Sequence, residues 1–183
     1  PERRISTYNL NPSMKQRPKN VTDKLAIQFF PEGGTLVKGI SSRVAFKAES
    51  REEGNVILEG AIYTKDGKKL TEIKTLHDGM GIFAYTPEEK PAVAKVVYKE
   101  KEYQFDLPDA LPAGYVLNVN NSSGAIVGNV LSNRDTPDAD IVAFISHEGR
   151  PYSYWVLRMR SGGNQTFFLK TRDLPGGIYQ VSL

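Results

Sequence analysis

The chain has 183 residues, of which 39% are hydrophobic and 25% are charged, so it can bury a core and is not disordered throughout. Its net charge is only +3, with 24 basic residues scattered among 21 acidic ones, which argues against a nucleic-acid partner. The absence of cysteine excludes disulfides, thiolate nucleophiles and cysteine-ligated zinc. No apolar stretch approaches the roughly 20 residues that cross a bilayer, so we expect a chain that does not itself span a membrane.

Residues 1–24 are polar, contain three prolines and follow no sustained hydrophobic period. They are predicted to form an extended N-terminal arm or a linker from a preceding domain. A basic arm for nucleic acid is the weaker interpretation, because aromatic residues are not interleaved with its positive charges. The chain begins with Pro1 and not with methionine, which favours a segment taken from a longer protein.

Residues 25–108 carry short apolar runs that alternate with period two and are separated by turn residues, which predicts about seven strands. Asp66 and Gly67 in "KDGK" mark a hairpin between two of them. Seven short antiparallel strands are typical of an immunoglobulin-like β-sandwich. The predicted strands lie in the segments "LAIQFF", "RVAFKAE", "NVILEGAIY", "KLTEIKTL", "GIFAYTP", "AVAKVVY" and "EYQFDLP".

The prolines of "LPDALPAG" predict a linker over residues 109–113, without strand or helix. Residues 114–183 then repeat the strand pattern about six times, which predicts a second sandwich. The predicted fold class is therefore all-β, with two tandem immunoglobulin-like antiparallel sandwiches. The strands of the second sandwich are expected in "YVLNVN", "GAIVGNVLS", "DIVAFIS", "YSYWVLRMR", "QTFFLKT" and "GIYQVSL".

The two halves show an internal correspondence near their ends. In the first, Phe83 and Tyr85 precede a turn and a strand, and a further strand follows; in the second, Phe167 and Leu169 precede "RDLPGG" and a strand that ends at Leu183. The second sandwich is thus expected to lack its last strand and to leave an exposed edge that can pair with another chain. We expect the intact protein to continue by at least one strand, unless a neighbouring molecule or the N-terminal arm fills the gap.

The two histidines stand in similar triplets, with Asp78 after His77 and Glu148 after His147, each followed by glycine. Neighbouring residues of one strand point to opposite faces, and no third ligand lies at a workable spacing, so neither pair is a ready metal chelate. Both triplets are predicted to be turns.

The loop "SNRDTPDAD" concentrates oxygen ligands, among them Asp135, Asp138 and Asp140, which could hold Ca²⁺. Their spacing does not match an EF-hand, and Asp and Pro are also the residues of a solvated loop. A plain loop is the favoured interpretation, and the three aspartates are kept as weak metal candidates.

The strand "PYSYWVLRMR" carries the most suggestive surface. In a regular strand Trp155, Leu157 and Met159 would face the core. The opposite face could form an aromatic and guanidinium platform for a sugar ring or a partner protein, although simple packing against the sheet is the favoured interpretation. The residues of that candidate platform are Tyr152, Tyr154, Arg158 and Arg160.

Nothing in the sequence indicates a catalytic site. No GxSxG segment occurs, and glycine-rich phosphate loops need a helix N-terminus that a β-only pattern does not supply. We therefore predict no catalytic residue, no cofactor and no enzyme.

The segment "FFPEGGTLVKGISSRVAFKA", followed by "LEGAIYTKDGKKL", "HDGMGIFAYTPEEK" and "FDLPDALPAGYVLNV", resembles the macroglobulin-type domains of large bacterial envelope proteins, which are relatives of α2-macroglobulin. The resemblance covers roughly residues 25–183. It implies non-catalytic sandwiches of a longer protein, exported to the periplasm or the outer-membrane-associated envelope of a Gram-negative bacterium. The thioester of the parent family cannot form in a chain without cysteine.

The predicted function is thus a structural or interaction segment that spaces and orients neighbouring domains. Its expected partners are the flanking domains of the same chain or another envelope protein. The alternative is a carbohydrate-binding module that stacks a sugar on Tyr152 and Tyr154. Gly33 and Gly34 are predicted to turn the chain, so that Leu36 and Val37 re-enter the edge of the first sheet.

Overall fold

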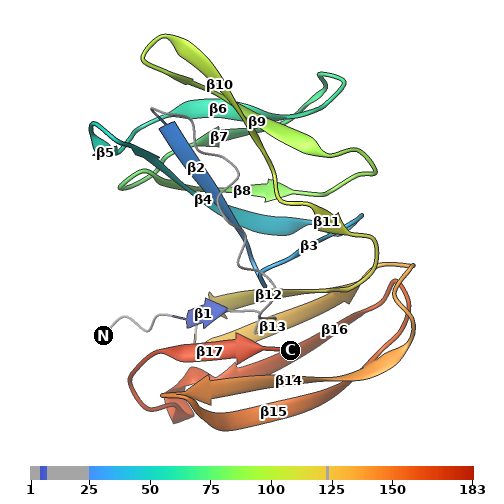
Figure 1. The fold of residues 1–183 in the computed structure, drawn as a ribbon. Helices are drawn as coiled ribbons and strands as arrows, with labels where there is room; N and C mark the ends of the chain where they lie inside the picture. The colour runs from blue at the N-terminus through green and yellow to red at the C-terminus, as the bar shows by residue number, and fades with distance from the viewer. Residues whose placement is uncertain (1–4, 8–24, 123) are drawn as a thin grey trace. The chain divides into compact units, whose positions relative to one another are not determined.

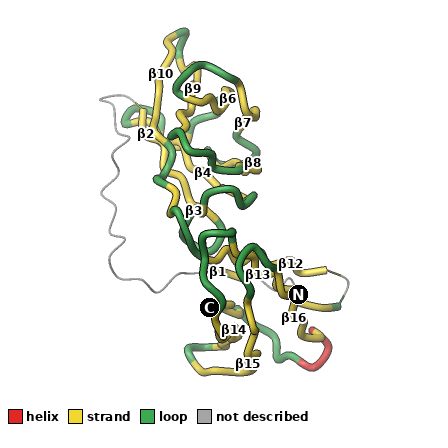
Figure 2. The backbone as a smooth tube through the Cα atoms, turned by 90° about the vertical axis from the view of Figure 1, so that its right-hand side faces the viewer, coloured by secondary structure: helices red, strands yellow, loops and turns green. Residues whose placement is uncertain are grey.

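The computed structural model of the chain describes residues 5–7, 25–122 and 124–183 (Figure 1). Within these ranges the fold is all-β, and the helical content is a single 3-10 turn, η1 (Thr171–Asp173), drawn red in Figure 2. None of the described helical residues forms a segment long and apolar enough to cross a membrane. The described residues divide into two compact units, and each is an immunoglobulin-like β-sandwich.

The first unit, here called the N-terminal sandwich, comprises Leu25–Pro31 and Ser41–Ala110. One of its sheets has β4 between β2 and β8, with the short β5 also paired to β4, and the other has the order β10-β9-β6-β7. All of these pairings are antiparallel. The strands are β2 (Leu25–Pro31), β4 (Ser42–Ser50), β5 (Gly54–Asn55), β6 (Glu59–Thr64), β7 (Lys69–Lys74), β8 (Met80–Tyr85), β9 (Ala92–Tyr98) and β10 (Lys101–Asp106).

Alternation of buried and exposed side chains explains these strands. Every second residue of β4 is buried, and Phe46 is at its centre with 1% of its surface exposed. Its ring lies 6.5 Å from that of Phe29 and 6.2 Å from that of Phe83, so three neighbouring strands meet in one aromatic cluster. The period-two pattern predicted all seven long strands because each has one face in the core.

The second unit, the C-terminal sandwich, comprises the described residues of Ile5–Thr7, Glu32–Ile40 and Leu111–Leu183. One sheet has the order β12-β13-β16, and the other has the order β1-β17-β14-β15. The strands are β1 (Ile5–Thr7), β12 (Tyr115–Ser122), β13 (Ala125–Ser132), β14 (Ala139–His147), β15 (Arg150–Met159), β16 (Asn164–Lys170) and β17 (Tyr179–Ser182).

The core of the C-terminal sandwich contains an aromatic stack that depends on a glycine. Phe167 is buried, and its ring stacks on Trp155 with centroids 4.7 Å apart. Gly128, the cross-strand partner of Phe167, leaves the space that this ring occupies. Tyr179 is fully buried, and its hydroxyl donates a hydrogen bond of 2.9 Å to the Pro175 carbonyl, an arrangement like the tyrosine corner of Greek-key sandwiches.

Apart from the short β5, the two sandwiches repeat one topology with one difference, which lies at the end of the chain order. Six strands of each sandwich are equivalent in their pairing. Taken in chain order, the equivalent strands are β12 and β2, β13 and β4, β14 and β6, β15 and β7, β16 and β8, and β17 and β9. The N-terminal sandwich then adds β10, antiparallel to β9, whereas the corresponding edge of β17 is occupied by β1, which runs parallel to it (Figure 1). The sequence predicted that the second sandwich lacks its last strand, and three residues of the N-terminal arm pair at that place.

Glu32–Ile40, which we call the strap, lies between β2 and β4 in the chain but belongs to the C-terminal sandwich. The expectation that Leu36 and Val37 re-enter the first sheet is therefore wrong. These two residues form β3 (Leu36–Val37), which pairs with β11 (Ala110–Leu111). The expectation that residues 109–113 contain no strand is wrong for the same reason, since β11 gains a partner that the sequence pattern does not reveal.

Both histidine triplets are turns, as predicted. His77 and Met80 exchange backbone hydrogen bonds of 3.3 and 2.7 Å across Asp78 and Gly79, which have positive φ angles of 47° and 72°. Two successive positive φ angles are typical of the type I′ turn of a two-residue hairpin. Glu148 and Gly149 join β14 to β15 in the same way, with φ angles of 51° and 76°.

Candidate functional site

The strap is held on the C-terminal sandwich by a hydrogen bond from the backbone of β12. The Val119 amide donates to Oε1 of Glu32 over 2.9 Å. Gly33 follows with φ +78°, and a Cβ placed on it would lie 3.5 Å from the Leu117 carbonyl oxygen. The glycine thus allows a left-handed turn directly against a strand backbone. "PEGG" is accordingly an attachment point, and its glutamate accepts a hydrogen bond from a strand backbone.

Apolar contacts continue the attachment. Val37, Ile40 and Val116 form a small buried cluster, and Leu131 packs against it from β13. Val37 is completely buried and Val116 is 1% exposed. Val116 alternates along β12 with Leu117, which belongs to the main core of this sandwich. The strap therefore covers the outer face of β12 with a second, smaller core.

The loop that follows β13 ties the strap to residues 112–114. Nδ2 of Asn133 donates hydrogen bonds to the carbonyl oxygens of Lys38, at 3.2 Å, and Pro112, at 2.6 Å. Oδ1 of Asn133 accepts a hydrogen bond of 2.6 Å from the hydroxyl of Thr136, which in turn accepts one of 2.7 Å from the Gly114 amide. Thr136 is buried, so these polar groups require the partners that the loop supplies.

The aspartates of this loop have individual partners on the surface. Oδ1 of Asp138 accepts a hydrogen bond of 2.8 Å from the Ser161 amide, and Oδ1 of Asp140 lies 3.3 Å from Nε of Arg158. Asp135 is exposed. Throughout the described part of the chain, no group of three or more His, Asp or Glu residues is placed to hold a metal ion. The hydrogen bonds of the Asp loop therefore attach it to neighbouring segments of the chain.

The predicted core face of β15 is confirmed, whereas the four platform residues are not brought together. Trp155 packs against the core. Ile145 pairs with Ser153 and Ser146 with Pro151, so Tyr152 is an extra residue in a β-bulge. Its ring packs edge-on against Tyr179 at 6.0 Å.

The remaining candidates lie elsewhere along this strand. Tyr154 is 70% exposed and faces outward beside Phe144, its cross-strand partner. Arg158 also faces outward and pairs with Asp140. Arg160 follows the last residue of the strand, and its carbonyl accepts a hydrogen bond of 2.7 Å from the Ser132 hydroxyl. The sequence could not predict the displacement of Tyr152 because it arises from a bulge in the pairing of β15 with β14.

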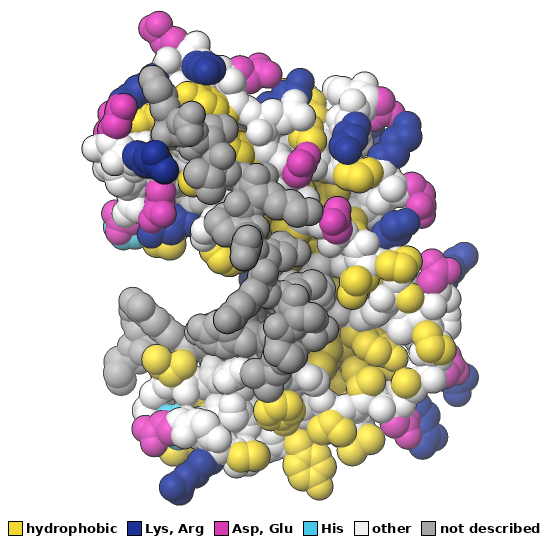
Figure 3. Space-filling view, in the orientation of Figure 1, with side chains coloured by type: hydrophobic (Ala, Val, Ile, Leu, Met, Phe, Trp, Pro, Cys, Tyr) yellow, Lys and Arg dark blue, Asp and Glu magenta, His cyan; other side chains and the backbone are white. Residues whose placement is uncertain are grey.

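An apolar surface replaces the predicted platform on the outer face of β14 and β15. Val142 and Val156 are cross-strand partners with 47% and 63% of their surfaces exposed. Together with Phe144 and Tyr154 they form two adjacent pairs of one sheet face. Figure 3 shows hydrophobic side chains gathered over these strands.

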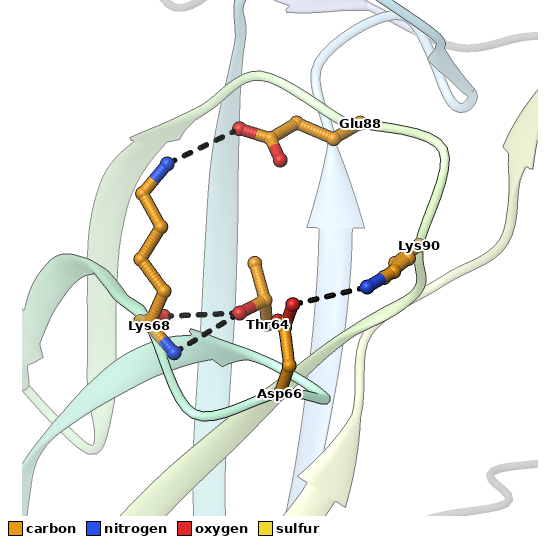
Figure 4. Close-up of polar contacts among 5 residues, drawn as sticks. All are labelled: Thr64, Asp66, Lys68, Glu88 and Lys90. Carbon is orange, nitrogen blue, oxygen red and sulfur yellow. Dashed lines mark hydrogen bonds and ion pairs between the residues drawn. The ribbon is translucent and has the colours of Figure 1, made fainter.

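A second polar cluster lies at the β6–β7 hairpin of the N-terminal sandwich (Figure 4). Oδ2 of Asp66 accepts from Nζ of Lys90 at 3.0 Å, and Nζ of Lys68 lies 3.8 Å from Oε1 of Glu88. The Lys68 amide donates to the Thr64 hydroxyl over 3.1 Å. A hydrogen bond from the Thr64 hydroxyl, followed by one from Lys90, lowers the pKa of Asp66 from 3.8 to about 2.

This shift predicts an Asp66 titration that NMR can follow. A carboxylate with a lowered folded-state pKa stabilises the fold above its ordinary value of 3.8, and that contribution is lost as the pH falls toward about 2. Thr64→Val should move the pKa of Asp66 back toward 3.8, because it removes the hydroxyl. Glu88→Gln is the matched control and should leave it near 2. An Asp66 that titrates near 3.8 in the unmodified chain would contradict the assignment.

Comparisons with known proteins give matches among solved structures. One is the native conformation of E. coli alpha-2-macroglobulin, with 12% identity over 84% of this chain and a TM-score of 0.33. Another is a mutant of Salmonella alpha-2-macroglobulin, with 11% identity over 80% of this chain and a TM-score of 0.31. The chain spans 12% of the length of each of these proteins. No family model and no curated protein matches the chain.

The strap is the element that sequence reasoning missed. Leu36, Val37 and Ile40 are buried, but they form apolar groups too short for a strand of typical length. Leu36 and Val37 stand between two glycines with positive φ angles, Gly34 and Gly39, and Ile40 directly follows the second glycine. Short buried apolar groups between two glycine turns are the signal that could have indicated a separate packing segment.

Proposed function

We propose that the chain is a non-catalytic structural segment of a longer, exported envelope protein, in which it spaces and orients neighbouring domains. Support comes from its two immunoglobulin-like sandwiches and from the macroglobulin resemblance of its sequence. The polar clusters of the described residues also have a structural explanation. The charged groups of Asp66, Lys90 and Arg158 are paired on the surface, and Asn133 and Thr136 bind backbone atoms of their own sandwich.

The observation that carries this proposal is the route of the chain. Among the described residues it passes between the two sandwiches at 31–32, at 40–41 and at 110–111. Two domains joined by one flexible linker reorient freely by default. Three covalent connections restrict that freedom, because rotation about any one of them is opposed by the other two. A segment of this kind suits a protein that must hold its flanking domains in a defined orientation.

Measurement of ¹⁵N relaxation tests the proposal. We expect the amides of both sandwiches to report one rotational correlation time. A short Gly-Ser insertion after Asp109 loosens one connection and leaves the other described connections intact, so the common value should persist in that variant. Two distinct correlation times in the unmodified chain, each appropriate to a single sandwich, would overturn the orienting role.

A further inference from the structure

The outer edge of β17 is a place where a strand is added to a finished sheet. Tyr179, Gln180 and Val181 pair with Ile5, Ser6 and Thr7, and the two strands run parallel. On its other side β17 pairs antiparallel with β14, from Tyr179 to Ser182. The same edge in the N-terminal sandwich is covered by β10, which is next in the chain after β9. The C-terminal sandwich thus obtains its edge strand from a distant part of the sequence.

The pairing between β1 and β17 is short compared with its counterpart. β10 pairs with β9 over six residues in register, whereas β1 pairs with β17 over three. Each hydrogen bond of such a ladder contributes about 0.5–1.5 kcal/mol net, so the backbone pairing of β1 contributes little free energy. The edge itself is well supported, because Tyr179 and Val181 are completely buried in the core. The edge of β17 is therefore a stable place for a strand to pair, whereas the backbone pairing of β1, the strand that occupies this edge, is weak.

The position of β1 in the chain also permits exchange. Residues 8–24 separate it from β2, and a chain of this length can reach up to about 55 Å when extended. The β1 strand of one copy can accordingly reach the β17 edge of another copy. Exchange of an identical element replaces each lost contact by the same contact between copies, which makes it a route to association of low cost.

We propose that the edge of β17 is a strand-acceptor site, and that Ile5–Thr7 of a second copy of this chain can occupy it in place of the chain's own β1. The partner is thus an extended segment that adds a parallel strand by backbone hydrogen bonds. This mode of recognition is β-augmentation, in which main-chain pairing provides the affinity.

Cysteine trapping tests the proposal in the full chain, which contains no cysteine of its own. Ser6 and Gln180 are paired residues of neighbouring strands, about 4.8 Å apart, and this spacing is compatible with a disulfide. Copies with Ser6→Cys are mixed with tagged copies with Gln180→Cys under mild oxidation. We expect disulfide-linked heterodimers on a non-reducing gel, at roughly tenfold the yield obtained when the tagged copies carry Arg158→Cys. Arg158 is exposed on β15, away from this edge, and is the matched control.

Two further outcomes keep the test decisive. The double variant Ser6→Cys with Gln180→Cys should also form an intrachain disulfide at low protein concentration. If that monomer forms but heterodimers stay at the level of the Arg158→Cys control, the exchange is overturned.

A synthetic peptide of residues 1–10 with Ser6→Cys, offered to the full Gln180→Cys chain, avoids any effect of the substitution on the folding of the copy that supplies β1. The peptide should be captured by a disulfide to the cysteine that replaces Gln180 in the full chain. Loss of capture when the peptide also carries Ile5→Pro and Thr7→Pro would show that backbone pairing is required. Capture that proline does not affect, or no capture of the original peptide, would overturn the site.

Discussion

Gly128→Val is expected to destabilise the C-terminal sandwich by about 3 kcal/mol, because it places additional atoms in a core that has no space for them. A Cβ at Gly128 would overlap the Phe167 ring. That ring is buried between Gly128 and Trp155, so it cannot move away without disturbing the stack. Protein interiors are packed densely enough that such an insertion forces shifts of side chains and backbone.

Denaturant unfolding followed by tryptophan fluorescence measures this effect. Trp155 is the single tryptophan of the chain, and it packs against the core of the C-terminal sandwich. The midpoint of its transition should fall strongly in the Gly128→Val variant. Gly176→Val is the matched control, since a Cβ at Gly176 meets no atom within 4 Å. Equal midpoints for the two variants would show that Phe167 does not occupy the space over Gly128.

Val37→Asp is expected to destabilise the same sandwich by several kcal/mol, although Val37 precedes most of the N-terminal sandwich in the chain. The substitution buries a carboxylate in the cluster that Val37 forms with Ile40 and Val116. The milder Val37→Ala removes two buried methyl groups and should cost about 2 kcal/mol. The Trp155 transition is again the readout, because the strap belongs to the sandwich that contains this tryptophan.

Ser41→Asp is the matched control for the strap. Ser41 is exposed and directly follows the strap, so a charge at this position should leave the Trp155 transition unchanged. If Val37→Asp also left that transition unchanged, the strap would not be part of the C-terminal sandwich.

The strands were predictable from the sequence wherever one face is buried. The alternation of Val44, Phe46 and Ala48 predicts β4, and all three side chains are buried. Leu157 and Met159 likewise mark the core face of β15. The turns were predictable for a different reason, because Asp-Gly favours the positive φ angles observed after His77, and glycine accepts the positive φ angle of Gly149 after His147 and Glu148.

The features that define the surface and the connections were not predictable in this way. The bulge at Tyr152 depends on the register between β14 and β15, and register is a property of two strands that no single strand specifies. The pairing of β3 with β11 joins residues more than 70 positions apart, and each strand has only two residues. β1 was not predictable either, because its three residues carry no strand signal of their own.

The central claim is that Glu32–Ile40 folds as part of the C-terminal sandwich, so that the described residues cross between the two units at three places. Methyl NOE spectroscopy of the full chain tests this claim most directly. The account predicts strong NOEs between the methyl groups of Val37 and Val116, and between those of Ile40 and Val116. Methyl groups of Val37 that showed NOEs only to residues of 41–110, and none to Val116, would contradict it.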